Sequence, residues 1–154
     1  MKYLLDTNML LRFFDEENER HEMVKGAMAS LRLDAHTLCV TSQNLVESWN
    51  VVTRPTAKNG FGYTLVEAAR MQVTLTDLFE LLPDSPLVYP EWLRLVQAYG
   101  VSGVQVHDTR LVAFCLVYGV SHILTLNTRD FVRFAPEGIT TVDAATVVPT
   151  PTNP

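Results

Sequence analysis

The chain is poor in cysteine, has no long apolar run and carries no excess of basic residues. Its two cysteines, Cys39 and Cys115, lie in apolar stretches without a CxxC or His-rich neighbourhood, which favours buried free thiols over a disulfide or a zinc site. The amino-terminal residues carry charges throughout and the apolar runs elsewhere are short or periodic, so neither a signal peptide nor a membrane span is predicted. We therefore expect a cytoplasmic protein.

The net charge of −5 excludes the global basic footprint that marks many nucleic-acid-binding proteins. Any polyanion would have to meet a local basic patch or metal ions on this chain. At 154 residues, of which 47% are apolar, the chain fits one domain that buries roughly 70% of its unfolded surface. We expect the domain to span residues 1–145, and residues 146–154, which are rich in Pro and Thr, to form a flexible tail.

Strand and helix patterns alternate along the chain. Apolar and β-branched runs predict strands, and apolar residues that recur every three or four positions predict the helices between them. Ser42 is the expected N-cap of the second helix, and Thr64 with Glu67 has the form of a capping box. The alternation predicts an α/β fold with a parallel sheet covered by helices on both faces. The expected strands are 2–5, 36–41, 81–88, 122–126 and 139–142, and the expected helices are 16–33, 43–53, 65–78, 91–99 and 108–118.

The first expected strand ends on a carboxylate, in the sequence Leu4-Leu5-Asp6-Thr7-Asn8. In an open α/β sheet, ligands bind in the crevice outside the carboxyl ends of the strands, so Asp6 is placed where a ligand is expected. An alternative is that Asp6 only caps a helix, because short acids are common at that position.

Two further acids are placed near the same edge by the expected elements. Asp108 opens a helix whose apolar positions follow three, four, seven and eight residues later, so its carboxylate begins the buried face. Its alternative role is a cap that complements the helix dipole. Glu47 lies within a helix and shares a face with Asn50 and Arg54, which is typical of groups that support a metal ion and a phosphate.

Polar residues also follow the fourth expected strand, at Thr125, Asn127 and Asp130. Several carboxyl and amide oxygens at one sheet edge would repel one another unless a cation lay between them. Oxygen ligands without nearby His or Cys favour Mg²⁺ or Mn²⁺ over zinc. Such ions activate water and neutralise charge on a phosphodiester, which allows an acidic protein to act on an anionic polymer. The basic residues that are candidates for contacting the phosphates of such a polymer are Arg12, Arg54, Lys58, Arg110, Arg129 and Arg133.

Two other classes of protein with a ligand site after the first strand are disfavoured. A haloacid-dehalogenase-like phosphatase needs a second Asp two residues after the first as its general acid, and Asn8 stands there instead. A nucleotide-binding or dinucleotide-binding protein would show G-x-G-x-x-G or G-x-x-x-x-G-K-[ST], and the sequence contains neither.

Taken together, four blocks resemble the PIN domain family, particularly the VapC-type toxin ribonucleases. The blocks are Leu-Leu-Asp6-Thr-Asn, the helix from Ser42 with Glu47, His107-Asp108-Thr-Arg-Leu, and Leu-Thr125-Leu-Asn127-Thr-Arg-Asp130-Phe, in the family's order. The resemblance implies a three-layer α/β/α fold with a central parallel sheet of four to five strands in the order 3-2-1-4-5. It also implies a Mg²⁺- or Mn²⁺-dependent endoribonuclease that is frequently a homodimer and often inhibited by a small VapB-like antitoxin.

By position, Asp6, Glu47 and Asp108 match the three core acids of that family, which implies that they are catalytic residues and metal ligands. Many relatives carry Asp where Asn127 stands, so Asp130 or Asn127 must serve as the fourth group here. Two alternatives remain open: a PIN-fold RNA-processing nuclease without an antitoxin, and a non-catalytic PIN module that binds RNA or protein. The residues expected to order water or a weaker second ion around the acids are Asn8, Thr125 and Asn127.

Overall fold

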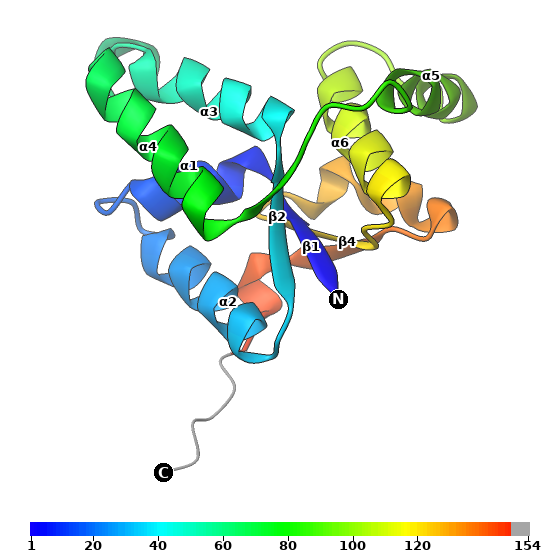
Figure 1. Ribbon diagram of the computed structural model, residues 1–154, viewed down its shortest axis with the longest axis horizontal. Coiled ribbons are helices and arrows are strands. Elements are labelled where there is room, and N and C mark those ends of the chain that lie inside the picture. Colours follow the sequence, from blue (N-terminus) through cyan, green and yellow to red (C-terminus); the bar gives the residue numbers. More distant parts are fainter. Residues whose placement is uncertain (149–154) are drawn as a thin grey trace.

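Five parallel strands form a single sheet in the computed structural model, which describes residues 1–148 (Figure 1). Their order across the sheet is β3-β2-β1-β4-β5. The expected α/β fold and strand order are therefore confirmed, with the first strand at the centre. Most of the expected flexible tail, residues 149–154, lies outside the described residues. The strands are β1 (Lys2–Leu5), β2 (Thr37–Thr41), β3 (Glu80–Leu82), β4 (His122–Thr125) and β5 (Thr140–Asp143).

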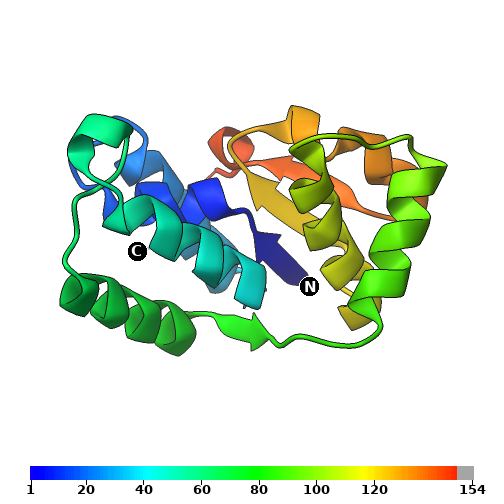
Figure 2. The same cartoon turned by 90° about the horizontal axis from the view of Figure 1, so that it is seen from above.

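Helices cover both faces of the sheet (Figure 2). One face packs against α1 (Thr7–Phe14), α2 (His21–Leu33), α3 (Ser42–Thr53) and α4 (Leu65–Leu78), and the other packs against α5 (Val88–Ala98) and α6 (Gln105–Tyr118). Within residues 1–148, none of the helices is long and apolar enough to cross a membrane. Short 3-10 helices complete the chain: η1 (Thr56–Lys58), η2 (Thr128–Asp130), η3 (Val132–Glu137) and η4 (Ala144–Thr146).

The central strand β1 contributes to both cores of the protein. Tyr3 and Leu5 belong to the core on the side of α1 to α4, and Leu4 belongs to the core on the side of α5 and α6, because successive side chains of a strand point to opposite faces. Leu4 and Leu5 are both 0% exposed, and burying such a side chain stabilises a fold by about 1.5–3 kcal/mol. The strand that leads to Asp6 is therefore held firmly from both sides.

Several helix boundaries differ from the sequence expectation. The pattern does not predict α1, a short helix that follows the first strand directly. Helix α2 begins at His21 rather than at residue 16, because the residues between are charged or polar and offer no apolar face. Thr41 rather than Ser42 is the N-cap of α3, where its hydroxyl accepts a hydrogen bond from the Asn44 N–H at 3.2 Å. The expected capping box at the start of α4 is confirmed.

The expectation for the middle of the chain is partly wrong. The third strand ends at Leu82, and after two prolines the chain enters α5 at Val88, three residues before the expected helix start at Glu91. Helix α6 begins at Gln105, so Asp108 lies in its first turn rather than at its first position. Prolines interrupt the strand because they cannot donate to the ladder of hydrogen bonds.

The carboxyl ends of β1 and β4 meet at one edge of the sheet. Leu5 pairs with Leu124, and the Asp6 N–H donates to the Leu124 carbonyl at 3.0 Å. Helix α3 follows the carboxyl end of β2 without a linker, so its first turn lies at the same edge. This edge therefore gathers polar residues that are far apart in the sequence.

The loop between α3 and α4 folds back on the end of α3. The Gly62 N–H donates to the Arg54 carbonyl at 2.9 Å, and the Tyr63 N–H donates to the Val52 carbonyl at 2.8 Å. Gly60 fits only because it has no side chain, since a Cβ there would lie 2.0 Å from the Arg54 carbonyl oxygen. The loop thus has one tightly specified shape.

Gly60→Ala should lower the free energy of unfolding by about 1–3 kcal/mol, because the added methyl group meets backbone that is already hydrogen-bonded. Gly26→Ala inside α2 is the matched control, since nothing lies within 4 Å of its added Cβ. That change should raise the free energy of unfolding by about 0.5–1 kcal/mol. Urea unfolding followed by circular dichroism measures both, and a Gly60→Ala protein as stable as the wild type would contradict the described loop.

Candidate metal-binding acidic site

Asp6 lies at the end of β1 with its carboxylate inside the protein, where the side chain is only 6% exposed. Its Oδ1 accepts a hydrogen bond from the Thr7 N–H at 2.7 Å, and its Oδ2 accepts one from the Thr125 hydroxyl at 2.7 Å. Burial raises the pKa of Asp6 from 3.8 to about 6, although both hydrogen bonds oppose the rise. Asp6 caps α1, so the cap interpretation is correct, and its oxygens retain lone pairs for a ligand.

A chain of hydrogen bonds connects α1 to α3 beside Asp6. The Thr7 hydroxyl donates to Glu47 Oε2 at 2.6 Å and accepts a hydrogen bond from Asn44 Nδ2 at 3.0 Å. Gln43 Nε2 donates to Glu47 Oε1 at 2.7 Å. Both carboxylate oxygens of Glu47 are thus held in a fixed orientation rather than left in solvent.

Asp108 lies in the first turn of α6 and interacts with the other acids through their charges. Burial, followed by the charges of Asp6, Asp130 and Glu47, raises the pKa of Asp108 from 3.8 to about 7, while the Arg133 guanidinium lowers it. Gln43 also joins α3 to the start of α6, because its Nε2 donates to Glu47 Oε1 at 2.7 Å and to the carbonyl of His107, the residue before Asp108, at 2.8 Å. We refer to Asp6, Glu47, Asp108 and Asp130 as the acid cluster.

Amide and hydroxyl groups connect the end of β4 to the acid cluster. The Asn127 N–H donates to Thr125 Oγ1 at 2.9 Å, and Asn127 Nδ2 donates to Asp130 Oδ2 at 2.8 Å. Asn8 Nδ2 approaches Thr125 Oγ1 at 3.4 Å, which is a long hydrogen bond. Thr125 is fully buried. Through its hydrogen bonds to Asp6 and Asn127, it connects the buried carboxylate of Asp6 to the more exposed Asp130.

The chemistry of these donors suits a hard divalent cation, because the cluster offers carboxylate oxygens and contains no thiolate or imidazole. Within residues 1–148, no three His, Cys, Asp or Glu side chains form a group ready to hold one ion directly. Mg²⁺ commonly binds through one or two carboxylates and keeps several of its waters. The acid cluster therefore fits an ion that is bound directly by one or two acids and through water by the others.

The basic residues expected to contact phosphates differ in their closeness to the cluster. Arg110 is linked to it, since its Nη1 donates to Gln43 Oε1 at 3.0 Å. Arg12 forms an ion pair with Asp15 at 2.8 Å, and Arg129 is exposed on η2. Arg12 shares a small hollow with Asn8 and Asn127, and Arg129 directly precedes Asp130 on η2.

Arg54 and Lys58 are not brought to the acids. Arg54 follows α3 seven residues beyond Glu47, which corresponds to about 10 Å along a helix axis. Lys58 is exposed in η1, further along the same loop. Arg133, by contrast, is close enough to affect the pKa of Asp108.

Three polar residues of the site were not singled out by the sequence analysis: Thr7, Gln43 and Asn44. Gln43 could have been found, because it precedes Glu47 by four residues and side chains at that spacing meet on a helix. Thr7 could have been suspected only from its position after Asp6. Its hydrogen bond to Glu47 crosses 40 positions of the sequence, and no local pattern reveals such a contact.

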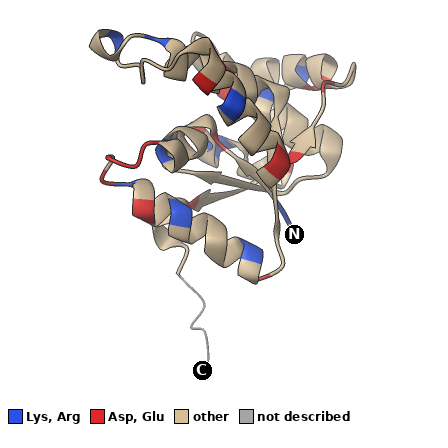
Figure 3. Ribbon diagram, turned by 60° about the vertical axis from the view of Figure 1, so that its left-hand side comes forward, with Lys and Arg blue, Asp and Glu red and all other residues tan. Residues whose placement is uncertain are grey.

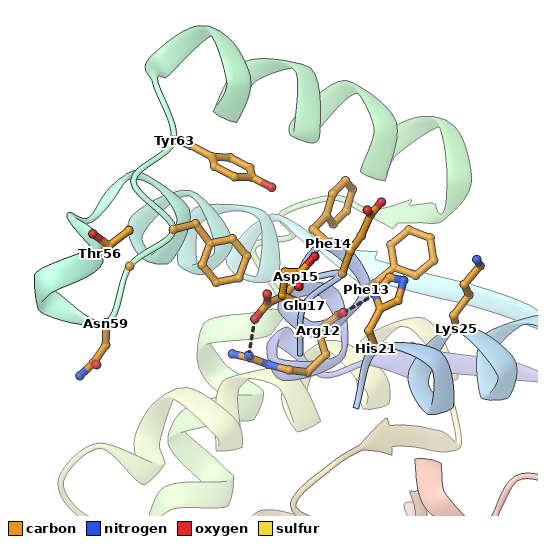
Figure 4. A pocket seen from close by; sticks show the side chains of 13 residues that line it. Arg12, Phe13, Phe14, Asp15, Glu17, His21, Lys25, Thr56, Asn59 and Tyr63 are labelled. Carbon is orange, nitrogen blue, oxygen red and sulfur yellow. Dashed lines mark hydrogen bonds and ion pairs between the residues drawn. The ribbon is translucent and has the colours of Figure 1, made fainter. Parts of the chain in front are cut away.

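A cavity of about 1000 Å³ lies outside the acid cluster, at the carboxyl end of α1 (Figure 4). Helices α1 and α2 and the loop before α4 form its walls. Its aromatic side chains are Phe13, Phe14, Phe61 and Tyr63. The loop between α1 and α2, which is largely red in Figure 3, adds acidic residues to the lining: Asp15, Glu16 and Glu17.

The raised pKa values predict that the metal-free protein loses stability as the pH rises. Folded Asp6 and Asp108 keep protons that the unfolded chain releases above about pH 4, so this stabilisation is complete at low pH and is lost as the pH passes about 6 and 7. Asp108→Asn removes one of the repelling charges. It should raise the free energy of unfolding by about 2 kcal/mol at about pH 8 in EDTA, and much less at about pH 5, as urea titrations would measure.

Asp77→Asn is the control, because Asp77 is exposed on α4 and does not belong to the cluster. That variant should keep the pH dependence of the wild type. Added Mg²⁺ should stabilise the wild type at about pH 8 more than it stabilises Asp108→Asn. A variant Asp108→Asn no more stable than the wild type at that pH would show that the four acids do not form one electrostatic group.

The chain is similar in sequence to one protein family and in fold to several solved structures. A family model described as the PIN domain matches residues 3–136. No curated protein sequence matches the chain. A solved structure of VapBC2 from Rickettsia felis, bound to a DNA fragment from their promoter, matches with a TM-score of 0.68 and 15% identity, covering 93% of this chain and 98% of that one.

Two other solved structures are similar. VapBC-1 from nontypeable Haemophilus influenzae matches with a TM-score of 0.66 and 16% identity, covering 95% of this chain and 100% of that one. VapC20 from Mycobacterium tuberculosis, described as a Sarcin-Ricin loop cleaving toxin, matches with a TM-score of 0.61 and 16% identity, covering 91% of this chain and 98% of that one. At these identities the likeness shows the fold alone. The family model, however, spans most of the sequence, and the chain therefore belongs to the PIN domain family.

Proposed function

We propose that this protein is a Mg²⁺- or Mn²⁺-dependent endoribonuclease and the toxin of a VapBC-like toxin–antitoxin pair. The observation that supports this most directly is the buried carboxylate of Asp6, with the charges of Glu47 and Asp130 acting on it. Such a group of acids is unfavourable by itself and becomes favourable when a cation neutralises it. The fold agrees with this reading, since VapBC2 and VapC20 share it.

In this proposal Asp6 and Asp108 bind the ion directly, while Glu47 and Asp130 act through water. A bound divalent ion supplies an activated water and neutralises the charge that develops at the phosphorus. Thr7 and Gln43 hold Glu47 in its orientation, and Thr125 does the same for Asp6. The residues that we assign to ordering water near Asp130 are Asn8 and Asn127.

Arg110, Arg12 and Arg129 are the proposed contacts to RNA phosphates. Arg110 is linked to the acid cluster through Gln43, Arg12 shares a hollow with Asn8 and Asn127, and Arg129 precedes Asp130 on η2. Phosphate contacts position a nucleic acid without reading its sequence. Arg54 and Lys58 remain candidates only for RNA that extends past the end of α3. The acidic chain would then meet its anionic substrate through one ion and a few arginines rather than through a basic surface.

Purified protein should cut single-stranded RNA in Mg²⁺ or Mn²⁺ and not in EDTA. Asp6→Asn and Asp108→Asn should each lower the cleavage rate by on the order of a hundredfold or more, because each removes a charge that the ion and the reacting phosphate require. Gel analysis of a labelled RNA pool measures the rate. The control Asp77→Asn should cut like the wild type.

A non-catalytic module would behave differently in the same experiment. It would show no cleavage in any metal and no Mn²⁺ binding that depends on Asp6, as calorimetry would detect. Cleavage by Asp108→Asn at the wild-type rate would mean that the acids are assigned wrongly.

We further propose that the cavity at the end of α1 receives the antitoxin. Its lining is aromatic and holds three acids against two cations, Arg12 and Lys25, of which Arg12 is already paired with Asp15, so it fits an apolar segment that also carries a basic side chain. RNA is a poorer fit, because Asp15, Glu16 and Glu17 would repel phosphates. The homodimer implied by the resemblance remains a prediction for sedimentation analysis.

The protein encoded beside this gene should inhibit cleavage if it is the antitoxin. Glu17→Lys in the cavity lining should weaken its binding about tenfold, because an attraction becomes a repulsion at a desolvated interface. Asp77→Lys, which makes the same charge change outside the cavity, should leave the affinity unchanged. Calorimetry measures both, and the absence of such a neighbouring gene would favour an RNA-processing nuclease instead.

A further inference from the structure

A second hollow, of about 590 Å³, adjoins the acid cluster between α3 and α6. Glu47 forms part of its wall, so the hollow opens beside the place where we expect the scissile phosphate. It also contains an arginine and a hydroxyl group, which are ligands that favour an anion. The residues that matter here are Ser42, Gln43, Glu47, Asp84, His107 and Arg110.

The Arg110 guanidinium is held in place before any ligand arrives. It lies over the ring of Phe114 at 4.9 Å from the centroid, and its Nη1 donates to Gln43 Oε1 at 3.0 Å. A planar guanidinium fixed in this way loses little conformational freedom when it binds a phosphate with two parallel hydrogen bonds. Arg110 is therefore suited to bind a phosphate.

Gln43 couples this arginine to the acid cluster. Its Nε2 donates to Glu47 Oε1 at 2.7 Å and to the His107 carbonyl at 2.8 Å, while its Oε1 accepts from Arg110. The amide cannot turn over, because its N–H groups would then face the guanidinium, which has only donors. One side chain thus sets the positions of Glu47 and Arg110 relative to each other.

In this hollow, the carboxylate of Asp84 lies where an anionic ligand would contact Ser42 and Arg110. Its Oδ1 accepts a hydrogen bond from the Ser42 hydroxyl at 2.8 Å and lies 3.5 Å from Arg110 Nη2. The Asp84 side chain is 71% exposed, and ion pairs of this kind contribute little to stability. The Tyr118 hydroxyl donates to the Pro83 carbonyl at 2.6 Å and anchors the backbone beside it, so rotation of the Asp84 side chain alone would vacate the place.

We propose that this hollow binds a backbone phosphate of the RNA next to the scissile one, through Arg110 and Ser42, and that Asp84 competes with that phosphate. Asp84 then takes the position of the phosphate in the absence of RNA. Gln43 is a positioning residue for both Arg110 and Glu47. This inference rests on the proposed ribonuclease function and adds to it a defined subsite for the substrate.

Removal of the competing carboxylate should improve binding. Asp84→Asn should lower the dissociation constant for a fluorescent single-stranded RNA, and the KM for its cleavage, by about twofold to fivefold, which matches the loss of a surface ion pair. Asp77→Asn controls for the change in net charge, since it removes an exposed acid outside the hollow. Binding is measured by fluorescence anisotropy in an Asp108→Asn background, so that cleavage does not disturb it.

Removal of the Arg110 guanidinium should weaken RNA binding. It should also abolish the gain in affinity that Asp84→Asn produces. Arg110→Met should raise KM about tenfold and reduce the slope of the logarithm of affinity against the logarithm of salt concentration by about 1. In the Arg110→Met background, Asp84→Asn should no longer tighten binding. A gain in RNA affinity from Asp84→Asn that persists in the Arg110→Met background would overturn the proposed competition. So would a gain from Asp84→Asn that is no larger than the gain from Asp77→Asn.

The positioning role of Gln43 needs a separate readout. Gln43→Met keeps the size of the side chain and loses its hydrogen bonds, so it should raise KM through Arg110 and lower kcat through Glu47, whereas Arg110→Met should change mainly KM. Identical effects of the two variants on both constants would contradict the coupling. If the wild type cuts no RNA, the ribonuclease proposal fails, while the anisotropy comparison of Asp84→Asn with Asp77→Asn still decides whether the subsite exists.

Discussion

The site depends on one constraint, which is that a carboxylate must be held inside the protein at the end of the central strand of its sheet. Asp6 follows the fully buried Leu5, and its two oxygens are held by the Thr7 N–H and the Thr125 hydroxyl. Those two hydrogen bonds offset part of the free energy that burial of the charge requires. They also join α1 to β4, so the same contacts that stabilise the carboxylate set the shape of the sheet edge.

The sequence predicts those parts of the site that can be recognised from neighbouring residues in the chain. Asp6 and Asp108 can be found because an acid at the end of an apolar strand, or in the first turn of an amphipathic helix, stands out from its neighbours. The strand order also follows once four weak blocks agree on one family. Glu47 is a weaker prediction, because the polar face it shares with Asn50 and Arg54 points to a site but Arg54 is not brought to the acids, and its match to a core acid comes from the resemblance.

The parts that cannot be predicted are contacts between distant elements and competition between local signals. The hydrogen bond from Thr7 to Glu47 exists only because α1 and α3 lie side by side, and no periodicity in either segment contains that information. Helix α1 is missed because eight residues give too short a window for a helical pattern. The third strand is overextended because Leu87 and Val88 look like strand residues, while the prolines before them end the ladder.

The acid cluster lies at the edge of a sheet that is packed on both faces. The raised pKa values of Asp6 and Asp108 mean that ionisation of these two carboxylates destabilises the metal-free protein as the pH passes about 6 and 7, so the rest of the molecule must supply the compensating free energy. Buried apolar side chains on both faces, Leu5 on one and Leu4 on the other, contribute to it next to the edge that carries the acids. Because Asp6 directly follows β1, the strand at the centre of the sheet also fixes the position of this buried carboxylate.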